Sequence, residues 1–237
     1  MNYVNLLIMQ FMAHILAEFI FQPDKTIKEK NDKGFKSSAL VIHSMVVFLL
    51  SWIFSLQFNF FVAALIITIT HYLMDGIKIV LSKKEELKNK AFFFDQSFHV
   101  IVIFTVVTIF AKYYPFEPVV NFSFDTKILL VIAAYLFCTK PANIIIKEIL
   151  NAYKINIPKN SAEDIPNAGK LIGDIERIIT LSLILNDQFG AVGFIIAAKS
   201  ILRFKDTDTG KTEYVLIGTL LSFGIAIIIG ILIQLYK

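Results

Sequence analysis

The side chains with the clearest potential for chemistry are four histidines that recur at nearly equal intervals. They are His14, His43, His71 and His99, spaced 28 or 29 residues apart, and each lies inside an apolar stretch. Ionisable groups are expensive inside a bilayer and by default mark a functional site there. If the four stretches are antiparallel membrane helices, the midpoints of neighbouring pairs, at about residues 28, 57 and 85, fall in the segments that join them. The spacing therefore predicts that all four imidazoles lie at one depth, in the cytoplasmic half of the membrane.

Three carboxylates accompany these histidines at four-residue spacing. The pairs are His14 with Glu18, His71 with Asp75, and Asp95 with His99. Residues four apart share one face of a helix. Because the fourth apolar stretch runs opposite to the first and third, each carboxylate is expected one turn closer to the cytoplasm than its histidine. The pattern predicts a layer of imidazoles next to a layer of carboxylates.

Such a set of nitrogen and oxygen donors is typical of a divalent metal site with an open position for water. The ion expected first is zinc, with manganese or iron as alternatives. The predicted ligands are His14, His43, His71, Asp75, His99, Glu18 and Asp95. The competing interpretation is a metal-free network in which histidines and carboxylates satisfy one another between helices.

Further polar residues on these stretches have predicted roles around the metal. A carboxylate that is not used as a ligand, Glu18 or Asp95, is the expected general base. Gln96 and Gln22 lie one turn or less from Asp95 and Glu18, and are expected to hydrogen-bond the ligands or the substrate.

A second charged cluster, in the C-terminal half, is also placed symmetrically about a predicted turn between two helices. Arg177 and Lys199 are each 11 residues from residue 188, and Glu176 and Ser200 are each 12, so the four are expected at one depth. Its surplus positive charge predicts binding of an anionic substrate group such as phosphate. The expected substrate-binding residues are Gln22, Lys140, Glu176, Arg177, Lys199, Ser200 and Arg203. The alternative is an internal network that pairs Glu176 with Lys199 and Asp174 with Arg203.

Composition indicates an integral membrane protein. The chain has 237 residues, is 56% hydrophobic and contains 23 phenylalanines, with a mean hydropathy of +0.67. Its apolar runs of about 20 residues suit helices that cross a bilayer core. The single cysteine, Cys138, excludes an intrachain disulfide and a thiolate metal site. No basic stripe interleaved with aromatic residues is present, so a nucleic-acid partner is not expected, and the pattern assigns no oligomeric state.

The apolar runs predict an all-helical, polytopic bundle of about eight transmembrane helices. The expected spans are 3–22, 38–56, 59–82, 93–112, 127–148, 168–185, 189–204 and 213–235, the first being retained and not a signal peptide. Lysines concentrate in alternate connections, and positive connections stay in the cytoplasm, which predicts both termini outside. Lys140-Pro141 is expected to kink the fifth span. Residues 1–112 form a predicted histidine and carboxylate half and 113–237 a basic half, within one integrated membrane domain.

Several segments resemble a known family of uncharacterised bacterial inner-membrane proteins with a domain of unknown function. They are HILAEFIFQ, HYLMD, DQSFH, GKLIGDIERI, GFIIAAKSILRF and EYVLIGTLLS, which together cover nearly the whole chain. The usual opening of the family has Asp where this chain has Glu18. The histidine and carboxylate pattern is also loosely similar to bacterial membrane-bound metal-dependent hydrolases, and this similarity implies hydrolysis at the inner membrane.

The hypothesis that unites these patterns is a membrane-embedded metal-dependent hydrolase. It would act from the cytoplasmic side on a lipid-linked or other anionic ester or phosphoester, with the lipid bilayer as its surroundings. A proton- or metal-coupled transporter that uses the same polar cavity is the alternative. A scaffold with a purely structural metal is a third interpretation.

Overall fold

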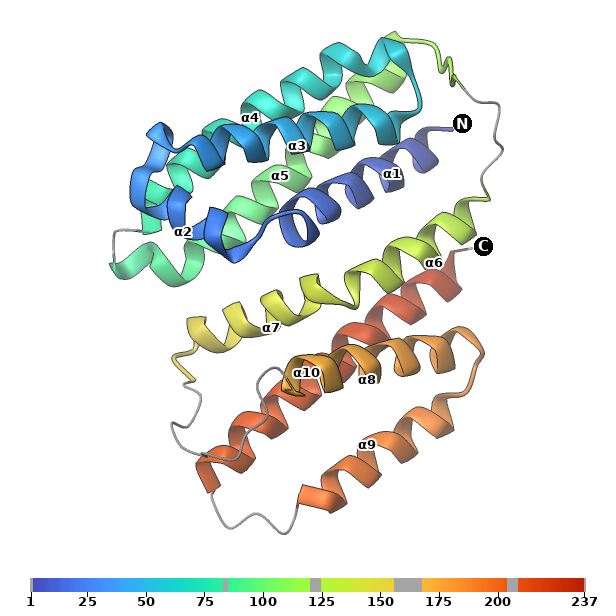
Figure 1. The fold of residues 1–237 in the computed structure, drawn as a ribbon. Coiled ribbons are helices and arrows are strands. Elements are labelled where there is room, and N and C mark those ends of the chain that lie inside the picture. Colours follow the sequence, from blue (N-terminus) through green and yellow to red (C-terminus); the bar gives the residue numbers. More distant parts are fainter. Residues whose placement is uncertain (1, 83–84, 120–124, 156–167, 204–208, 237) are drawn as a thin grey trace. The chain divides into compact units, whose positions relative to one another are not determined.

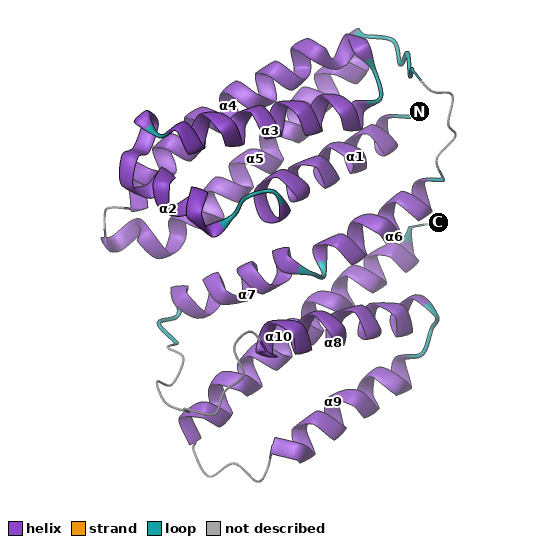
Figure 2. Ribbon diagram, viewed as in Figure 1, coloured by secondary structure: helices purple, strands orange, loops and turns teal. Residues whose placement is uncertain are grey.

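The protein is all-helical in the part of the chain that the structure describes (Figure 2). This computed structural model describes residues 2–82, 85–119, 125–155, 168–203 and 209–236, with side chains except at 85–89, 202–203 and 209–212. It contains two compact units, Met1–Ala133 and Ala134–Lys237. The helices are α1 (Tyr3–Ile15), α2 (Asp24–Lys33), α3 (Ser38–Ser55), α4 (Phe61–Ser82), α5 (Glu85–Tyr113), α6 (Thr126–Phe137), α7 (Lys140–Ala152), α8 (Ala168–Leu185), α9 (Phe189–Arg203) and α10 (Thr209–Leu235).

The first unit is a bundle in which α1, α3, α4 and α5 lie side by side (Figure 1). Its interior is filled by aliphatic and aromatic residues from all four helices, among them Leu6, Val47, Ile67 and Val107. The turn between α3 and α4 falls at the expected SLQFN segment, where Leu56 ends α3 in the left-handed conformation with φ 54°. This turn confirms the antiparallel pairing of α3 and α4, on which the predicted equal depth of His43 and His71 depends.

The outward faces of these helices are also apolar. On α3 the exposed residues Ile42, Met45, Leu49 and Ile53 recur every three to four positions and form one stripe. In water such a large exposed apolar surface would favour association with other apolar surfaces. A lipid environment solvates it directly. The stripe therefore agrees with the membrane character that composition predicts.

Five described helical segments are long and apolar enough to cross a membrane. They are Tyr3–Ile20, Ser38–Ser55, Phe58–Ser82, Lys90–Tyr113 and Glu213–Leu235. The pair α6 and α7 brings the number to six if it is one span, and it is bent by 51° at the predicted Lys140-Pro141 break. The predicted count of eight is not confirmed, because α8 carries four charged residues and the apolar part of α9 is short. The orientation of the termini stays a prediction.

The polar segment after the first span contains a helix that sequence analysis treated only as a connection. Pro23 precedes α2, and Gly34, with φ 58°, ends it in a conformation that favours glycine. The following 3₁₀ turn, Gly34–Lys36, carries Phe35, whose ring lies against Gly76 of α4 and whose carbonyl accepts a hydrogen bond from Tyr72 Oη at 3.2 Å. These contacts hold α2 at the end of the bundle where α4 carries Asp75.

The second unit is built around α7, α8 and α10, with a buried arginine among them. Arg177 is 1% exposed and donates hydrogen bonds to the Cys138 carbonyl at 2.6 Å and to Ser222 Oγ at 2.9 Å. Gly230 of α10 lies against Ile184 and Leu181 of α8, where a larger side chain would overlap Ile184. Small residues of this kind allow helices in membranes to approach closely.

Candidate metal centre

A π-helical turn at the end of α1 carries the carboxylate of the centre. Residues Leu16–Ile20 form this turn, closed by a bond from the Phe21 amide to the Leu16 carbonyl at 2.8 Å. Turns of this type widen a helix by one residue and are frequent at functional sites. Glu18 lies in the middle of the turn and is 7% exposed, so its side chain is directed into the bundle.

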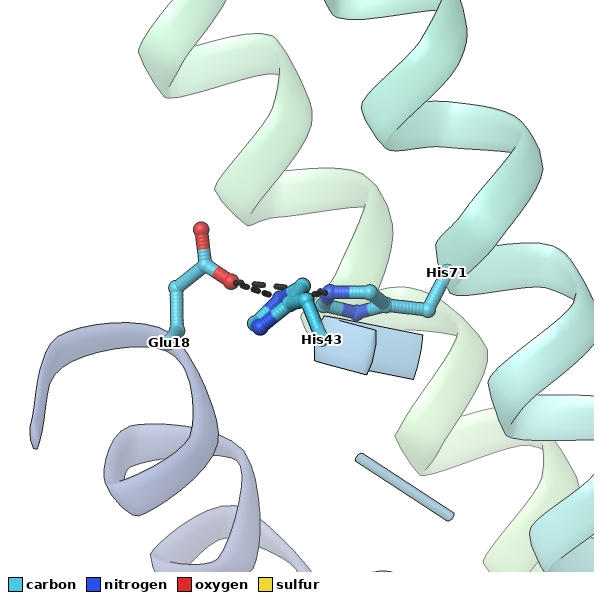
Figure 3. Close-up of side chains that lie close together, drawn as sticks. All are labelled: Glu18, His43 and His71. Atoms are coloured by element: carbon cyan, nitrogen blue, oxygen red, sulfur yellow. Dashed lines mark hydrogen bonds and ion pairs between the residues drawn. The ribbon is translucent and has the colours of Figure 1, made fainter. Parts of the chain in front are cut away.

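Glu18 meets two imidazoles from different helices, as Figure 3 shows. Glu18 Oε2 lies 3.1 Å from His43 Nε2 and 3.5 Å from His71 Nε2, and the two nitrogens are 2.9 Å apart. His43 comes from α3 and His71 from α4, and both side chains are almost fully buried. The three atoms thus form a small triangle inside the bundle.

The size of this triangle fits a common metal ligand set. Ligand atoms about 2.1 Å from a tetrahedral zinc ion are separated by roughly 3.3 Å. The three distances here, 2.9, 3.1 and 3.5 Å, lie on either side of that value. Two imidazoles and one carboxylate are also the protein ligands of many catalytic zinc sites, which keep a fourth position open. The residues present therefore fit a divalent metal ion.

Asp75, Asp95 and His99 lie next to this triangle and complete the cluster. His99 Nε2 is 3.0 Å from Asp95 Oδ1 and 3.6 Å from Asp75 Oδ1, while Asp75 Oδ2 is 3.7 Å from His43 Nε2. Each of the three side chains is at most 3% exposed. Three overlapping groups of donor atoms lie close enough together for metal binding: Glu18 with His43 and His71, His71 with Asp75 and His99, and Glu18 with Asp75 and Asp95.

Two lysines that sequence analysis missed neutralise two of the carboxylates. Lys30 of α2 donates a hydrogen bond to Asp75 Oδ2, and Lys78 of α4 donates one to Asp95 Oδ2 at 2.7 Å. Lys30 lies in a lysine-rich connection, where a lysine ordinarily sets topology. Lys78 had a usable signal: it lies three residues after Asp75, and its midpoint with Asp95 falls in the same connection as the midpoint of His71 and His99.

The net charge of the cluster is negative, and Glu18 is the carboxylate beside which a cation could balance it. Three carboxylates and two lysines sum to one negative charge when the imidazoles are neutral. Among the side chains that the structure describes, Glu18 is the one carboxylate of the three without a lysine partner. Charges buried in protein are costly unless they are paired. The carboxylate without a lysine partner is therefore the one in the triangle of ligand atoms, where its neighbours are His43 and His71.

The fourth histidine lies at the edge of the cluster. The His14 ring centroid is 5.5 Å from that of His99 and 6.0 Å from that of His71, so the predicted convergence of the imidazoles is present. His14 Nε2, however, lies 3.3 Å from Gln96 Oε1 and belongs to none of the three donor groups. Gln96 Nε2 in turn donates to Glu18 Oε1 at 3.3 Å and to Asp95 Oδ2 at 3.2 Å. Gln96 thus connects His14 to two carboxylates, the orienting role expected of it.

The two expected layers are not separate in the structure. The π turn alters the relation of His14 to Glu18, so that Glu18 reaches His43 and His71 and no direct bond joins it to His14 among the contacts described. Asp75 likewise lies among three imidazole nitrogens. Carboxylates and imidazoles therefore alternate within one cluster.

A small cavity of about 10 Å³, lined by both polar and aliphatic residues, lies beside the histidine rings. This space holds roughly one water molecule. His14, His71 and His99 line it together with Gln10, Ser51 and Thr70. Gln10 and Ser51 are joined by two hydrogen bonds, one from Ser51 Oγ to Gln10 Oε1 at 2.6 Å and one from Gln10 Nε2 to the Ser51 carbonyl at 2.8 Å. The buried imidazoles thus have polar neighbours on this side as well.

The charged residues of the second unit form the internal network that was the alternative to substrate binding. Arg177 Nη2 donates to Asp174 Oδ1 at 2.7 Å and to Asn143 Oδ1 at 2.8 Å, and Lys199 Nζ pairs with Glu176 Oε2 at 2.6 Å. The expected pairing of Glu176 with Lys199 is confirmed. Asp174 pairs with Arg177, its neighbour one turn along α8, whereas the side chain of Arg203 lies outside the described residues.

The remaining predicted substrate residues that the structure describes are Ser200 and Lys140 in the second unit and Gln22 in the first. Ser200 Oγ donates to the Ile196 carbonyl of its own helix, and Lys140 begins α7 beside the bend. Gln22 is 5% exposed, and its Nε2 has no hydrogen-bond acceptor among the described residues. Their roles in substrate binding stay predictions.

A family model, DUF3307, described as a protein of unknown function, matches residues 6–125. This segment contains all four histidines, the three carboxylates and both lysines of the cluster. No curated protein and no solved structure matches the chain.

Proposed function

The chain belongs to the DUF3307 family of proteins of unknown function, and we propose that it is a membrane-embedded metal-dependent hydrolase whose metal is held by Glu18, His43 and His71. The observation that carries the proposal is the triangle of Glu18 Oε2 and the two Nε2 atoms, with sides of 2.9 to 3.5 Å. It supplies ligands for one ion and leaves the unpaired charge of Glu18 to be neutralised. Zinc suits this donor set, and manganese and iron are the alternatives.

A divalent ion held here would lower the pKa of bound water and polarise the scissile group. The protein would supply the proton acceptor. If Glu18 is a metal ligand, a neighbouring carboxylate would serve as the general base. Asp75 is one candidate, because its Oδ2 lies 3.7 Å from Nε2 of the ligand His43. Asp95 is the other carboxylate available. Gln96 keeps Glu18 and Asp95 oriented through its two donated hydrogen bonds.

The substrate we propose is a lipid-linked or other anionic ester or phosphoester that enters from the cytoplasmic side of the bacterial inner membrane. The basic groups adjacent to the metal ligands are Lys30 and Lys78. We propose these two lysines as binders of the anionic group in place of Arg177 and Lys199, because they adjoin the proposed metal ligands; all four basic groups are paired with a carboxylate. The apolar outer face of α3 fits a substrate that diffuses within the bilayer.

The test is metal content followed by hydrolysis. Protein purified in detergent, loaded with Zn²⁺ or Mn²⁺ and desalted, is expected to retain metal in stoichiometric amounts. His43→Ala is expected to lose the ion held by the triangle and to reduce hydrolysis of a phosphoester substrate at least 100-fold, roughly the loss of a metal-activated nucleophile. His14→Ala is the matched control, since it removes a buried histidine outside the donor groups and is expected to retain the metal. Folded wild-type protein that retains no metal would overturn the proposal.

A proton- or metal-coupled transporter is the second candidate, and the bent pair of α6 and α7 favours it. Broken helices recur in transporters, where they line the pathway of an ion or substrate. Transport and hydrolysis can be distinguished by measuring flux and hydrolysis in proteoliposomes that contain the protein. Metal or proton flux in proteoliposomes that is abolished by His71→Ala, without any hydrolysis, would establish transport. A structural metal, in contrast, would leave neither activity, and its removal would unfold the protein.

A further inference from the structure

We infer that Asp75, Asp95 and His99 form a second cation site beside the first, so that the centre holds two divalent ions and acts on a phosphoester. This inference rests on the proposed function and deepens it, because it assigns the remaining members of the cluster and selects among the substrate classes. The three residues come from α4 and α5, whereas Glu18 and His43 of the first site come from the π turn and α3.

The polar atoms that face this site are buried and lack hydrogen bonds. Asp75 Oδ1, Asp95 Oδ1 and His99 Nε2 have no hydrogen-bond partner of suitable geometry among the described residues. They nevertheless lie close to one another, with His99 Nε2 3.0 Å from Asp95 Oδ1 and 3.6 Å from Asp75 Oδ1. Buried polar atoms are nearly always satisfied by protein, water or an ion. The described partners of these three atoms are one another: His99 forms ion pairs with both carboxylates if it is protonated, and neutral His99 and the two oxygens would instead be ligands for a cation.

The lysines bind the opposite oxygen of each carboxylate. Lys30 contacts Asp75 Oδ2 and Lys78 contacts Asp95 Oδ2, which leaves both Oδ1 atoms directed toward His99. A cation can therefore bind at the Oδ1 atoms while both ion pairs persist. The lysines fix the orientation of the carboxylates, as outer hydrogen-bond partners of metal ligands commonly do.

Asp75 lies between the two sites. Its Oδ2 is 3.7 Å from His43 Nε2 of the first site, and its Oδ1 faces His99 of the second. The rings of His71 and His99, one from each site, are stacked with centroids 4.0 Å apart and an interplanar angle of 19°. Asp75 thus lies within reach of both sites, and in a two-ion centre Asp75 and Asp95 would be ligands and would not serve as the general base of the one-ion centre.

The charge of the filled site selects an anionic substrate. Without metal, the three carboxylates and two lysines carry one negative charge, and one divalent ion converts this to one positive charge. A second ion raises the total to three positive charges within a buried cluster. A phosphoester group brings compensating negative charge, and two ions can stabilise its attacking and leaving oxygens together. A neutral carboxylic ester would leave the charge uncompensated.

The experiment combines metal counting with manganese spectroscopy on the full chain in detergent. Wild-type protein loaded with Mn²⁺ and desalted is expected to hold two ions per chain and to give the electron paramagnetic resonance spectrum of an exchange-coupled pair. His99→Ala and Asp95→Asn are each expected to hold one ion and to give an uncoupled spectrum. His14→Ala, which removes a histidine outside the donor groups, is expected to keep both ions and the coupling. Far-ultraviolet circular dichroism and gel filtration identify variants that fold, and His99→Gln substitutes for an unstable alanine variant.

Each result separates this inference from the function on which it rests. One ion per wild-type chain, unchanged by His99→Ala and lost in His43→Ala, would overturn the second site and leave the hydrolase proposal standing. Such a result would indicate that a proton shared by His99 with Asp75 and Asp95 occupies the space. No retained ion in folded protein would overturn both proposals. Two ions without magnetic coupling would overturn the placement of Asp75 between them.

Discussion

Two lysines change the interpretation of individual residues in this protein. Lys30 and Lys78 are embedded in a cluster that sequence analysis described only by its histidines and carboxylates. A lysine in a connection or near the end of an apolar stretch ordinarily sets topology or contacts lipid headgroups. The position of these two beside Asp75 and Asp95 gives them an electrostatic function inside the protein.

Removal of Lys78 is expected to destabilise the metal-free protein. Lys78→Met leaves Asp95, which is 1% exposed, without its cationic partner. Because the loss of one member of a buried ion pair is costly, and Lys78 itself is partly exposed, we expect a loss of about 2 to 4 kcal/mol, or roughly 5 to 10 °C in thermal midpoint. The measurement is thermal unfolding with and without Mn²⁺, and the ion is expected to reduce the loss.

Lys33→Met is the matched control for this prediction. Lys33 pairs with Glu29 at 3.1 Å on the surface of α2, where its side chain is 61% exposed. Exposed pairs contribute less than about 1 kcal/mol, so the control should unfold within a few degrees of the wild type. Equal losses in the two variants would show that the Lys78 pair is not buried in the functional state.

The convergence of the histidines could be predicted from sequence, but their individual partners could not. Equal spacing about each connection brought His14, His43, His71 and His99 to one depth, because depth depends only on helix rise and direction. The partner of Glu18 depends on a π turn, and four-residue spacing cannot show a turn that adds one residue. Sequence analysis therefore paired Glu18 with His14, whereas the structure pairs it with His43 and His71.

At the scale of helices, α2 is the element outside the four-helix bundle that contributes a side chain to the cluster. It brings Lys30 to Asp75, and the turn that follows brings Phe35 to Gly76. This helix could not be predicted from the sequence because nine of its ten residues are polar, and a single isoleucine gives no apolar stripe of the kind that marks an amphipathic helix. The bend at Lys140-Pro141 was predictable, since proline disfavours helix continuation through its missing amide.

Gly76→Ala is expected to detach the turn after α2 from α4. A methyl group at this position would overlap the Phe35 ring, which is exposed enough to swing away. Movement of Phe35 should also weaken the hydrogen bond from Tyr72 to its carbonyl. We expect faster trypsin cleavage after Lys33 and Lys36, measured by mass spectrometry of timed digests.

Gly218→Ala serves as the control for this variant. Gly218 lies in α10 with open space around the position of a Cβ atom. Alanine favours a helix over glycine by roughly 0.5 to 1 kcal/mol, so the control should digest at the wild-type rate and be no less stable. Unchanged cleavage in Gly76→Ala would mean that Phe35 does not hold this turn in place.

For the whole molecule, sequence predicted a helical membrane protein and the family, and both agree with the findings. Hydropathy gave the four helices of the first unit because each is apolar over about 20 residues. Its count of eight is not confirmed in the second unit, where α8 is amphipathic and three of its four charged residues, Asp174, Glu176 and Arg177, are paired within the protein. Apolar length alone cannot distinguish such a helix from a span.

The predicted orientation can be tested with cysteine labels. Phe58 lies exposed in the turn between α3 and α4, and Lys33 is exposed at the end of α2. With the lysine-rich connections in the cytoplasm, Phe58→Cys should react with a membrane-impermeant maleimide in right-side-out vesicles, whereas Lys33→Cys should react only after permeabilisation. Cys138 is fully buried and should give little background, which a Cys138→Ser parent checks. The reverse pattern would invert the topology.

The π turn of Leu16–Ile20 also has a consequence at the level of the gene. Because such a turn accommodates one residue more than an α-helical turn, in-frame loss of a single codon from this stretch would leave a continuous apolar helix. It would also let the turn close with ordinary α-helical bonds in place of the bond from the Phe21 amide to the Leu16 carbonyl. The histidine and glutamate codons would all remain, yet Glu18 would lose the π turn that now directs it to His43 and His71. In this stretch, the length of the reading frame matters as much as the amino acids it encodes.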